Sequence, residues 1–145
     1  MSYSTLSIDW EDFGQLLGMY HYNQVTAPVN GAIERQTSIM LDMLDETNSK
    51  ATFFILGMLA KYRPGLVKEI AARGHEIAIH GQNHKAMFSL TKEEAKNDLQ
   101  ECIDIVSGIT GEKVYGYRAP FFSVNETNLW LLELLAELGL LYDSS

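Results

Sequence analysis

The sequence predicts an α/β fold in which strands and helices alternate around one mainly parallel sheet. Short apolar runs recur along the 145 residues, and each is followed by a segment whose apolar residues repeat at helical spacing. No linker, low-complexity tract or change of composition interrupts this alternation. We therefore expect a single domain over residues 1–145, built either as a doubly wound sheet or as part of a barrel.

Five segments have the composition of strands. The clearest is 51–56, a continuous apolar run that is typical of a strand buried on both faces. The segment 13–29 has no such pattern and is expected to be a long loop of the functional kind. In chain order, the expected strands are 4–8, 51–56, 75–80, 114–117 and 140–142.

Four helices are expected between these strands, because each gap contains apolar residues three or four apart. Two of them begin with a capping box, in which a Ser or Thr and a Glu three residues later satisfy backbone N–H groups. Proline and glycine mark other helix ends. The signals are Asn30 for the first helix, Pro64 and Gly74 for the second, Thr91 and Glu94 for the third, and Ser123, Glu126 and Gly139 for the fourth.

Charge and cysteine content restrict the partners and the compartment. A formal net charge of −8 argues against nucleic acid and anionic membrane surfaces, because both attract basic patches. The single Cys102 excludes an intramolecular disulfide and fits a reducing compartment. No apolar run reaches the ~20 residues of a membrane span, and no secretory leader pattern opens the chain. We expect a cytoplasmic protein.

Polar residues that suit metal chemistry follow three of the expected strands. The carboxyl ends of parallel strands meet at one edge of a sheet or barrel, so these residues are expected to converge. Together they supply carboxylates, imidazoles and a guanidinium, which is the inventory of a mononuclear metal hydrolase. They are Asp9, Glu11 and Asp12 after the first strand, His80 and His84 after the third, and Arg118 after the fourth.

Each cluster also has a purely structural interpretation. Two histidines four residues apart can bind one metal from the same side of a helical turn, or they can be capping and core histidines. Three neighbouring acids can form a solvated turn. Arg118 can be a surface residue before Pro120, or a planar donor held against a carboxylate. His75, at the start of a strand, is expected to be structural.

The ordered motifs resemble the polysaccharide deacetylase family, the NodB homology domain of carbohydrate esterase family 4. The likeness is carried by the acidic cluster, His-x-x-x-His and Arg-x-Pro-aromatic, and by the flanking segments 51–57 and 73–77. It covers essentially the whole chain. The resemblance implies a distorted (β/α) barrel that removes N-acetyl groups from a sugar or polysaccharide. It also implies one divalent metal, commonly Zn²⁺, with Co²⁺, Mn²⁺ and Ni²⁺ as other options.

The resemblance also implies roles for single residues. Asp9 resembles the catalytic base, Arg118 the residue that pairs with it, and the backbone N–H of Phe121 an oxyanion donor. His80 and His84 match the two metal-binding histidines. The carboxylate ligand is either Glu11, which shares a strand face with Asp9, or Asp12, which keeps the aspartate of many relatives.

The sequence departs from the family at two points. Gly81 stands where many relatives carry Ser or Thr. The family's later motifs, including a histidine that protonates the leaving amine, do not occur, so we expect the front part of a barrel. Such a piece exposes a sheet edge and apolar surface, and self-association is expected.

Two other functions fit the same residues. One is a cyclic-amide hydrolase of the allantoinase type, some of which work without metal. The other is a non-catalytic module for assembly or carbohydrate binding. For a deacetylase, a precursor of a bacterial surface glycan is the expected substrate, and four aromatic residues are candidates to stack on sugar rings or to pack in the core. These aromatic residues are Trp10, Tyr20, Tyr22 and Phe122.

Overall fold

The computed structural model describes residues 5–12, 14 and 32–145. Its five strands form one sheet in the order β1-β2-β3-β4-β5, and each neighbouring pair is parallel. This confirms the predicted α/β class. The strands are β1 (Ser7–Trp10), β2 (Thr52–Ile55), β3 (Glu76–Ile79), β4 (Gly116–Tyr117) and β5 (Tyr142–Asp143).

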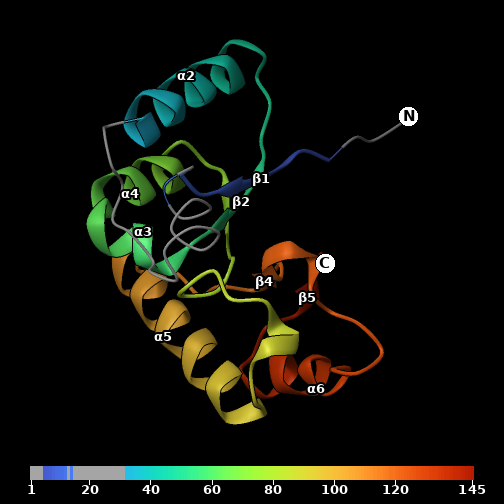
Figure 1. The fold of residues 1–145 in the computed structure, drawn as a ribbon. Helices are drawn as coiled ribbons and strands as arrows, with labels where there is room; N and C mark the ends of the chain where they lie inside the picture. Colours follow the sequence, from blue (N-terminus) through green and yellow to red (C-terminus); the bar gives the residue numbers. More distant parts are fainter. Residues whose placement is uncertain (1–4, 13, 15–31) are drawn as a thin grey trace.

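Helices connect the strands and follow one another around the outside of the sheet (Figure 1). The longest, α5, begins with the predicted capping box of Thr91 and Glu94 and ends at Gly111, which is left-handed. There are also two short 3₁₀ turns: η2 precedes α5, and η3 follows β4. The helical elements are α2 (Ala32–Glu46), α3 (Gly57–Tyr62), α4 (Pro64–Ala72), η2 (Met87–Ser89), α5 (Lys92–Thr110), η3 (Pro120–Phe122) and α6 (Trp130–Glu137).

The strand order decides between the two predicted architectures. A doubly wound sheet reverses its strand order part-way, which places helices on both faces. Here each strand lies beside the next one in the chain, so the right-handed crossovers all put their helices on the same side. This is the arrangement of a (β/α) barrel segment.

The two faces of the sheet differ in chemistry, because successive side chains of a strand point to opposite sides. The outer face is apolar and packs against the helices in the main core. Its central side chains are at most 3% exposed: Trp10, Phe53, Ile55, Ile79 and Tyr117. The intervening residues form an inner face that is largely polar and includes Asp9, Thr52, Glu76 and Arg118.

Contacts across the inner face show that the sheet curls. Glu76 on β3 accepts hydrogen bonds from the Thr52 hydroxyl at 2.5 Å and from the Tyr142 hydroxyl of β5 at 2.8 Å. The intervening strand β4 makes room with Gly116, where a Cβ would lie 2.2 Å from the Tyr142 hydroxyl oxygen. The inner face is therefore concave, as in a barrel.

The helices differ from the expectation in two respects: one helix was missed, and one predicted cap was wrong. The short helix α3 was not predicted, because its first N–H groups, those of Gly57 and Met58, are satisfied by carbonyls of another loop rather than by a local cap. Ser123 does not cap the fourth helix, since its hydroxyl accepts from the backbone N–H of Met87 at 2.8 Å and donates to the Pro120 carbonyl. Helix α6 begins only at Trp130.

Several predicted features lie outside the described residues. They are the cap Asn30, the aromatic residues Tyr20 and Tyr22, and most of the loop 13–29. Within the described ranges, no helix is both long and apolar enough to cross a membrane.

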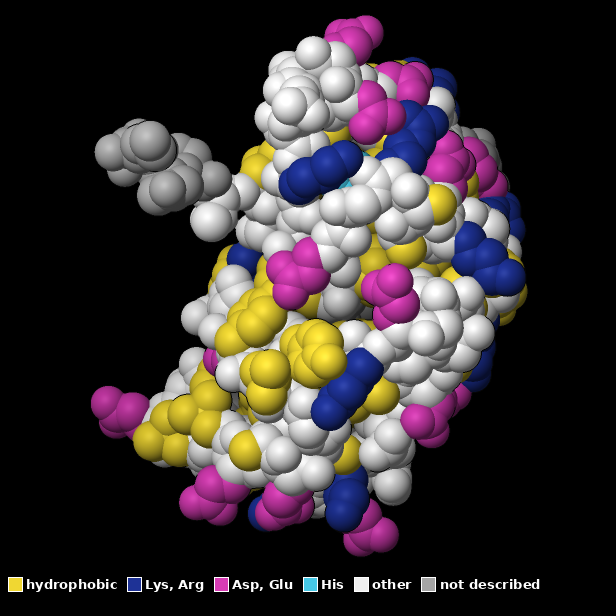
Figure 2. Space-filling view, turned by 180° about the vertical axis from the view of Figure 1, so that it is seen from behind, with side chains coloured by type: hydrophobic (Ala, Val, Ile, Leu, Met, Phe, Trp, Pro, Cys, Tyr) yellow, Lys and Arg dark blue, Asp and Glu magenta, His cyan; other side chains and the backbone are white. Residues whose placement is uncertain are grey.

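The described surface carries exposed apolar side chains as well as charge. Leu141, Phe88 and Phe122 are the most exposed large ones, at 75%, 61% and 61%. Figure 2 shows hydrophobic side chains gathered on the lower part of one face of the molecule, with acidic groups around them. Exposed apolar surface of this kind favours association, and self-association stays a prediction.

Candidate metal centre and active site

The two predicted histidine ligands lie in the loop that follows β3. His80 and His84 are each 2% exposed, and their ring centroids are 5.3 Å apart. The loop turns sharply between them, because Gly81 and His84 are both left-handed, with φ of 79° and 51°. The turn brings both imidazoles to the carboxyl edge of the sheet.

The orientation of His80 is set by a backbone contact. Its Nδ1 lies 2.8 Å from the carbonyl oxygen of Arg118, which directly follows the neighbouring strand β4. A carbonyl oxygen only accepts hydrogen bonds, so Nδ1 carries the proton and Nε2 keeps its lone pair. This arrangement is typical of a histidine that binds a metal through Nε2.

Glu11 completes a cluster of three possible metal ligands. Its Oε2 lies 2.7 Å from Nε2 of His84, and one donor atom from each of Glu11, His80 and His84 lies within 4.8 Å of the others. Bonds of ~2.0–2.2 Å in a tetrahedral zinc site place donor atoms about 3.3–3.6 Å apart, so shifts of about 1 Å would close the cluster on one ion. Two imidazoles and one carboxylate are a known catalytic zinc set that leaves a position open.

Asp12 does not join this cluster. It is 6% exposed and lies one residue beyond Glu11, but the group of converging donors contains Glu11 alone from the acidic segment. Of the two carboxylates that the sequence left open, the structure therefore brings only Glu11 to the histidines.

The electrostatics of the cluster shift the pKa of Glu11 and that of His80 downwards. Burial raises the pKa of Glu11, but its hydrogen bond to His84 and the charges of both imidazoles outweigh burial, and the pKa falls below its ordinary value. Burial also lowers the pKa of His80, despite the opposing charge of Asp9. A carboxylate and a neutral imidazole are the forms that coordinate a cation.

Asp9 and Arg118 form an ion pair beside this cluster. One guanidinium nitrogen donates to Oδ1 of Asp9 at 2.8 Å, and the other terminal nitrogen donates to the hydroxyls of Ser7 and Ser144. The guanidinium carbon lies 4.1 Å from the centre of the Phe54 ring. Arg118 thus reaches from β4 across the inner face to β1, and its contacts fix the position of the Asp9 carboxylate.

Phe121 lies against the metal cluster on a strained turn. Its ring meets that of His84 edge-on at 4.7 Å. Phe121 and Phe122 both have positive φ, of 59° and 49°, although neither is glycine. Such conformations cost of order 1–3 kcal/mol each and gather at functional sites. The turn therefore places the Phe121 ring against the candidate ligand His84.

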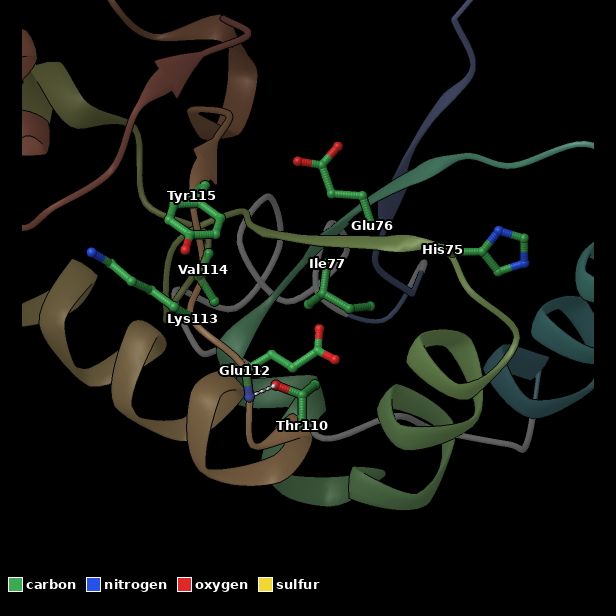
Figure 3. A pocket seen from close by; sticks show the side chains of 8 residues that line it. All are labelled: His75, Glu76, Ile77, Thr110, Glu112, Lys113, Val114 and Tyr115. Carbon is green, nitrogen blue, oxygen red and sulfur yellow. Dashed lines mark hydrogen bonds between the residues drawn. The ribbon is translucent and has the colours of Figure 1, made fainter.

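The opposite end of the sheet carries similar residue types without a site. A pocket there is lined by His75, Glu76, Glu112, Lys113 and Tyr115, among others, and their side chains point in different directions (Figure 3). His75 behaves as predicted, since its Nδ1 accepts from the backbone N–H of Ala51 and its ring packs on Phe53. Among residues 5–12, 14 and 32–145, the one converging group of possible ligands is that of Glu11, His80 and His84.

Some residues of the site were missed from the sequence. Asp98 on α5 holds the histidine loop, and Ser7 and Ser144 bind Arg118. Asp98 had a signal, because it is a carboxylate within the apolar stripe of its helix and is only 7% exposed. The two serines had none, since nothing local distinguishes them from other serines.

Comparison with known proteins identifies the family. The family model for polysaccharide deacetylases matches residues 28–142. The chain belongs to the polysaccharide deacetylase family. The match begins before α2 and ends at the first residue of β5, so it includes the histidine loop and Arg118 but not β1.

Curated members of the family share about a third of their residues with this chain over the matched part. A peptidoglycan deacetylase-like protein of Gibberella zeae is 33% identical over 108 residues, which are 73% of this chain and 31% of that protein. A peptidoglycan-N-acetylglucosamine deacetylase of Bacillus cereus is 34% identical over 98 residues, 67% of this chain and 36% of that protein. The chain thus spans about a third of the length of these relatives.

Solved structures share the fold. A protein from Mycobacterium smegmatis assigned as a polysaccharide deacetylase superposes with a TM-score of 0.78 at 29% identity, over 96% of this chain and 49% of that one. A carbohydrate esterase 4 pseudoenzyme from Bacillus anthracis superposes at 0.74 with 19% identity, over 96% and 41% of the two chains. The predicted NodB-like fold is confirmed.

Proposed function

We propose that this family member is a metal-dependent hydrolase that removes N-acetyl groups from a sugar or polysaccharide. The proposal rests on one observation: a two-histidine, one-carboxylate cluster lies beside a carboxylate that is held by an arginine. The cluster can hold a divalent ion and the Asp9 carboxylate can act as a base, which are the two parts that metal-assisted amide hydrolysis needs.

Each residue has a defined task in this proposal. Glu11, His80 and His84 would hold the ion, which when bound would lower the pKa of a water molecule and polarise the substrate carbonyl. Asp9 accepts the proton of the attacking water and can return it to the amine nitrogen as the C–N bond breaks, and Arg118 keeps the Asp9 carboxylate oriented. The backbone N–H of Phe121 donates to the oxyanion of the tetrahedral intermediate, a contribution of roughly 3–4 kcal/mol for a well-placed donor.

The ligand set narrows the choice of metal. Two imidazole nitrogens and a carboxylate oxygen suit borderline cations, so we propose Zn²⁺, with Co²⁺, Mn²⁺ and Ni²⁺ as alternatives that the same ligands accommodate. The two histidines are buried, and the Phe121 ring covers one edge of His84, so electrostatic interactions at the cluster are stronger than on an open surface.

The substrate is proposed to be a polymer that contains N-acetylglucosamine. Support comes from the names of the relatives, which include a peptidoglycan-N-acetylglucosamine deacetylase and a chitin deacetylase from Cryptococcus neoformans. The net charge of −8 agrees with an uncharged sugar better than with a polyanion. The exposed ring of Phe122 offers an apolar surface for a sugar ring at the edge of the site.

The test is acetate release from N-acetylglucosamine oligosaccharides, together with the metal content of the same samples. We expect the Asp9→Asn variant to keep its metal and to lose turnover by about 10²–10⁴-fold, because only the proton acceptor is removed. Glu76→Gln is the matched control, since Glu76 is an acidic residue of the same inner face at the other end of the sheet.

Two results would contradict the proposal. One is full turnover by Asp9→Asn. The other is a wild-type chain that binds metal with the expected stoichiometry but releases no acetate, which is the behaviour of a non-catalytic module. Hydrolysis of a cyclic amide in place of acetate release would favour the allantoinase-type activity.

A further inference from the structure

The loop between the two histidines is held from one side by a single face of α5. Asp98 accepts hydrogen bonds from the backbone N–H of Gln82 at 2.7 Å and from the side-chain amide of Asn83 at 3.0 Å. One turn further along α5, the thiol of Cys102 donates to the carbonyl of Gly81 at 3.2 Å. Asp98 and Cys102 are 7% and 0% exposed, so these contacts are buried.

The same loop is held from the other side by the start of α3. The backbone N–H of Gly57 donates to the Gly81 carbonyl at 2.9 Å, and that of Met58 donates to the Gln82 carbonyl at 3.0 Å. The start of α3 lies so close to the loop that a Cβ at Gly57 would be 2.0 Å from the side-chain oxygen of Gln82. Two helices therefore clamp the short segment that separates the histidines.

Asp98 is the one charged member of this clamp. A buried carboxylate needs hydrogen-bond donors, and both of its oxygens find them in the histidine loop. The loop needs a restraint in turn, because His84 has a left-handed backbone that a residue with a side chain rarely adopts. A Cβ at Gly81 would lie 3.3 Å from Oδ2 of Asp98, so the carboxylate also packs closely on the turn.

We propose that Asp98 is a positioning residue, which fixes the separation of His80 and His84 and thereby sets the affinity and geometry of the metal site. The inference rests on the proposed metal site and extends it to a residue that touches neither the ion nor the substrate. Loss of a hydrogen bond made directly to a metal ligand typically costs about 10–100-fold in affinity, and Asp98 acts on the two ligands through Gln82 and Asn83, which lie between them.

The experiment compares Asp98→Asn with the wild-type 145-residue chain. Zn²⁺ affinity is measured by competition with a chromogenic chelator, and ligand geometry by the visible absorption of the Co²⁺-loaded protein. Urea unfolding of the metal-free protein reports stability separately. Asp104→Asn is the matched control, because Asp104 is an exposed acid on the same helix whose carboxylate accepts from Gln100.

We expect Asp98→Asn to weaken Zn²⁺ binding by about 10–100-fold and to change the Co²⁺ spectrum, and Asp104→Asn to do neither. Should Asp98→Asn fail to fold, Asn83→Ala removes one of the two bonds, and a loss of about 2–10-fold in affinity is expected. Wild-type affinity and an unchanged Co²⁺ spectrum in the folded variant would overturn this inference alone. If the wild-type chain itself binds no metal, the proposed metal site falls with it.

Discussion

The two ends of the sheet carry the same kinds of residue, but within the described part of the chain only the carboxyl end gathers them into a candidate site. The amino end has His75, Glu76 and Glu112, and the carboxyl end has Glu11 with the two loop histidines. Only at the carboxyl end do the donor atoms approach within 4.8 Å of one another. A candidate metal centre therefore requires that the donor atoms converge, and the presence of suitable residue types alone is not enough.

The reason lies in what each polar group is already bound to. At the amino end, His75 accepts from a backbone N–H, and Glu76 accepts from the hydroxyls of Thr52 and Tyr142. These groups hold the curled sheet together. At the carboxyl end, the Arg118 carbonyl binds Nδ1 of His80, and Asp98 accepts a hydrogen bond from the backbone of the histidine loop. Nε2 of His80 is therefore left to face the cluster.

The largest expected effect is on Zn²⁺ affinity, in a comparison of His80 at the carboxyl end of the sheet with His75 at the amino end. His80→Ala removes one of three ligands, so Zn²⁺ affinity should fall by more than about 100-fold, beyond the usual loss from a disturbed supporting bond. His75→Ala should leave Zn²⁺ affinity within twofold of the wild type, although it lowers stability. Chelator competition measures the Zn²⁺ affinity of both variants. A comparable loss of affinity in His75→Ala would show that the two ends do not differ as proposed.

A smaller effect tests which carboxylate at the carboxyl end is the metal ligand. Glu11→Gln replaces the anionic ligand by a neutral amide, and we expect Zn²⁺ affinity to fall by about 10–100-fold. Asp12→Asn is the matched variant, and we expect affinity within a few-fold of the wild type because Asp12 lies outside the cluster. Isothermal titration of metal into both proteins decides between them, and the reverse order would assign the ligand to Asp12.

The smallest effect concerns the pH dependence of stability at the amino end. Burial lowers the pKa of His75 in the folded chain, whereas in the unfolded chain it stays near its ordinary value of about 6.5. As the pH falls below about 6.5, the unfolded state therefore binds the proton first, and stability is lost until the folded-state pKa is reached.

Urea unfolding at pH 7.5 and pH 5.5 measures this loss. His75→Gln retains a side-chain acceptor for the Ala51 N–H but does not titrate, so its stability should fall less between these pH values than that of the wild type. An equal loss in both proteins would show that His75 does not contribute to the acid sensitivity.

Periodicity was enough to find most of the fold. The apolar run of 51–56, the capping box at Thr91 and the glycine stop at Gly139 are local signals, and each marks an element that the structure contains. The signals failed where tertiary contacts replace local ones, as at Ser123, whose hydroxyl binds the Met87 N–H instead of capping a helix.

The alternation of apolar runs with helical periods predicted the α/β class, and the order of three motifs along the chain indicated the family and the residue types of the candidate site. Tertiary structure alone decided that the strands run in sequential order, that Glu11 rather than Asp12 meets the histidines, and that Asp98 clamps their loop. The two kinds of information differ in the distance along the chain over which residues interact. Helical and strand periods reflect neighbours a few residues apart, whereas Arg118 and Asp9 are 109 residues apart and meet only because the sheet curls.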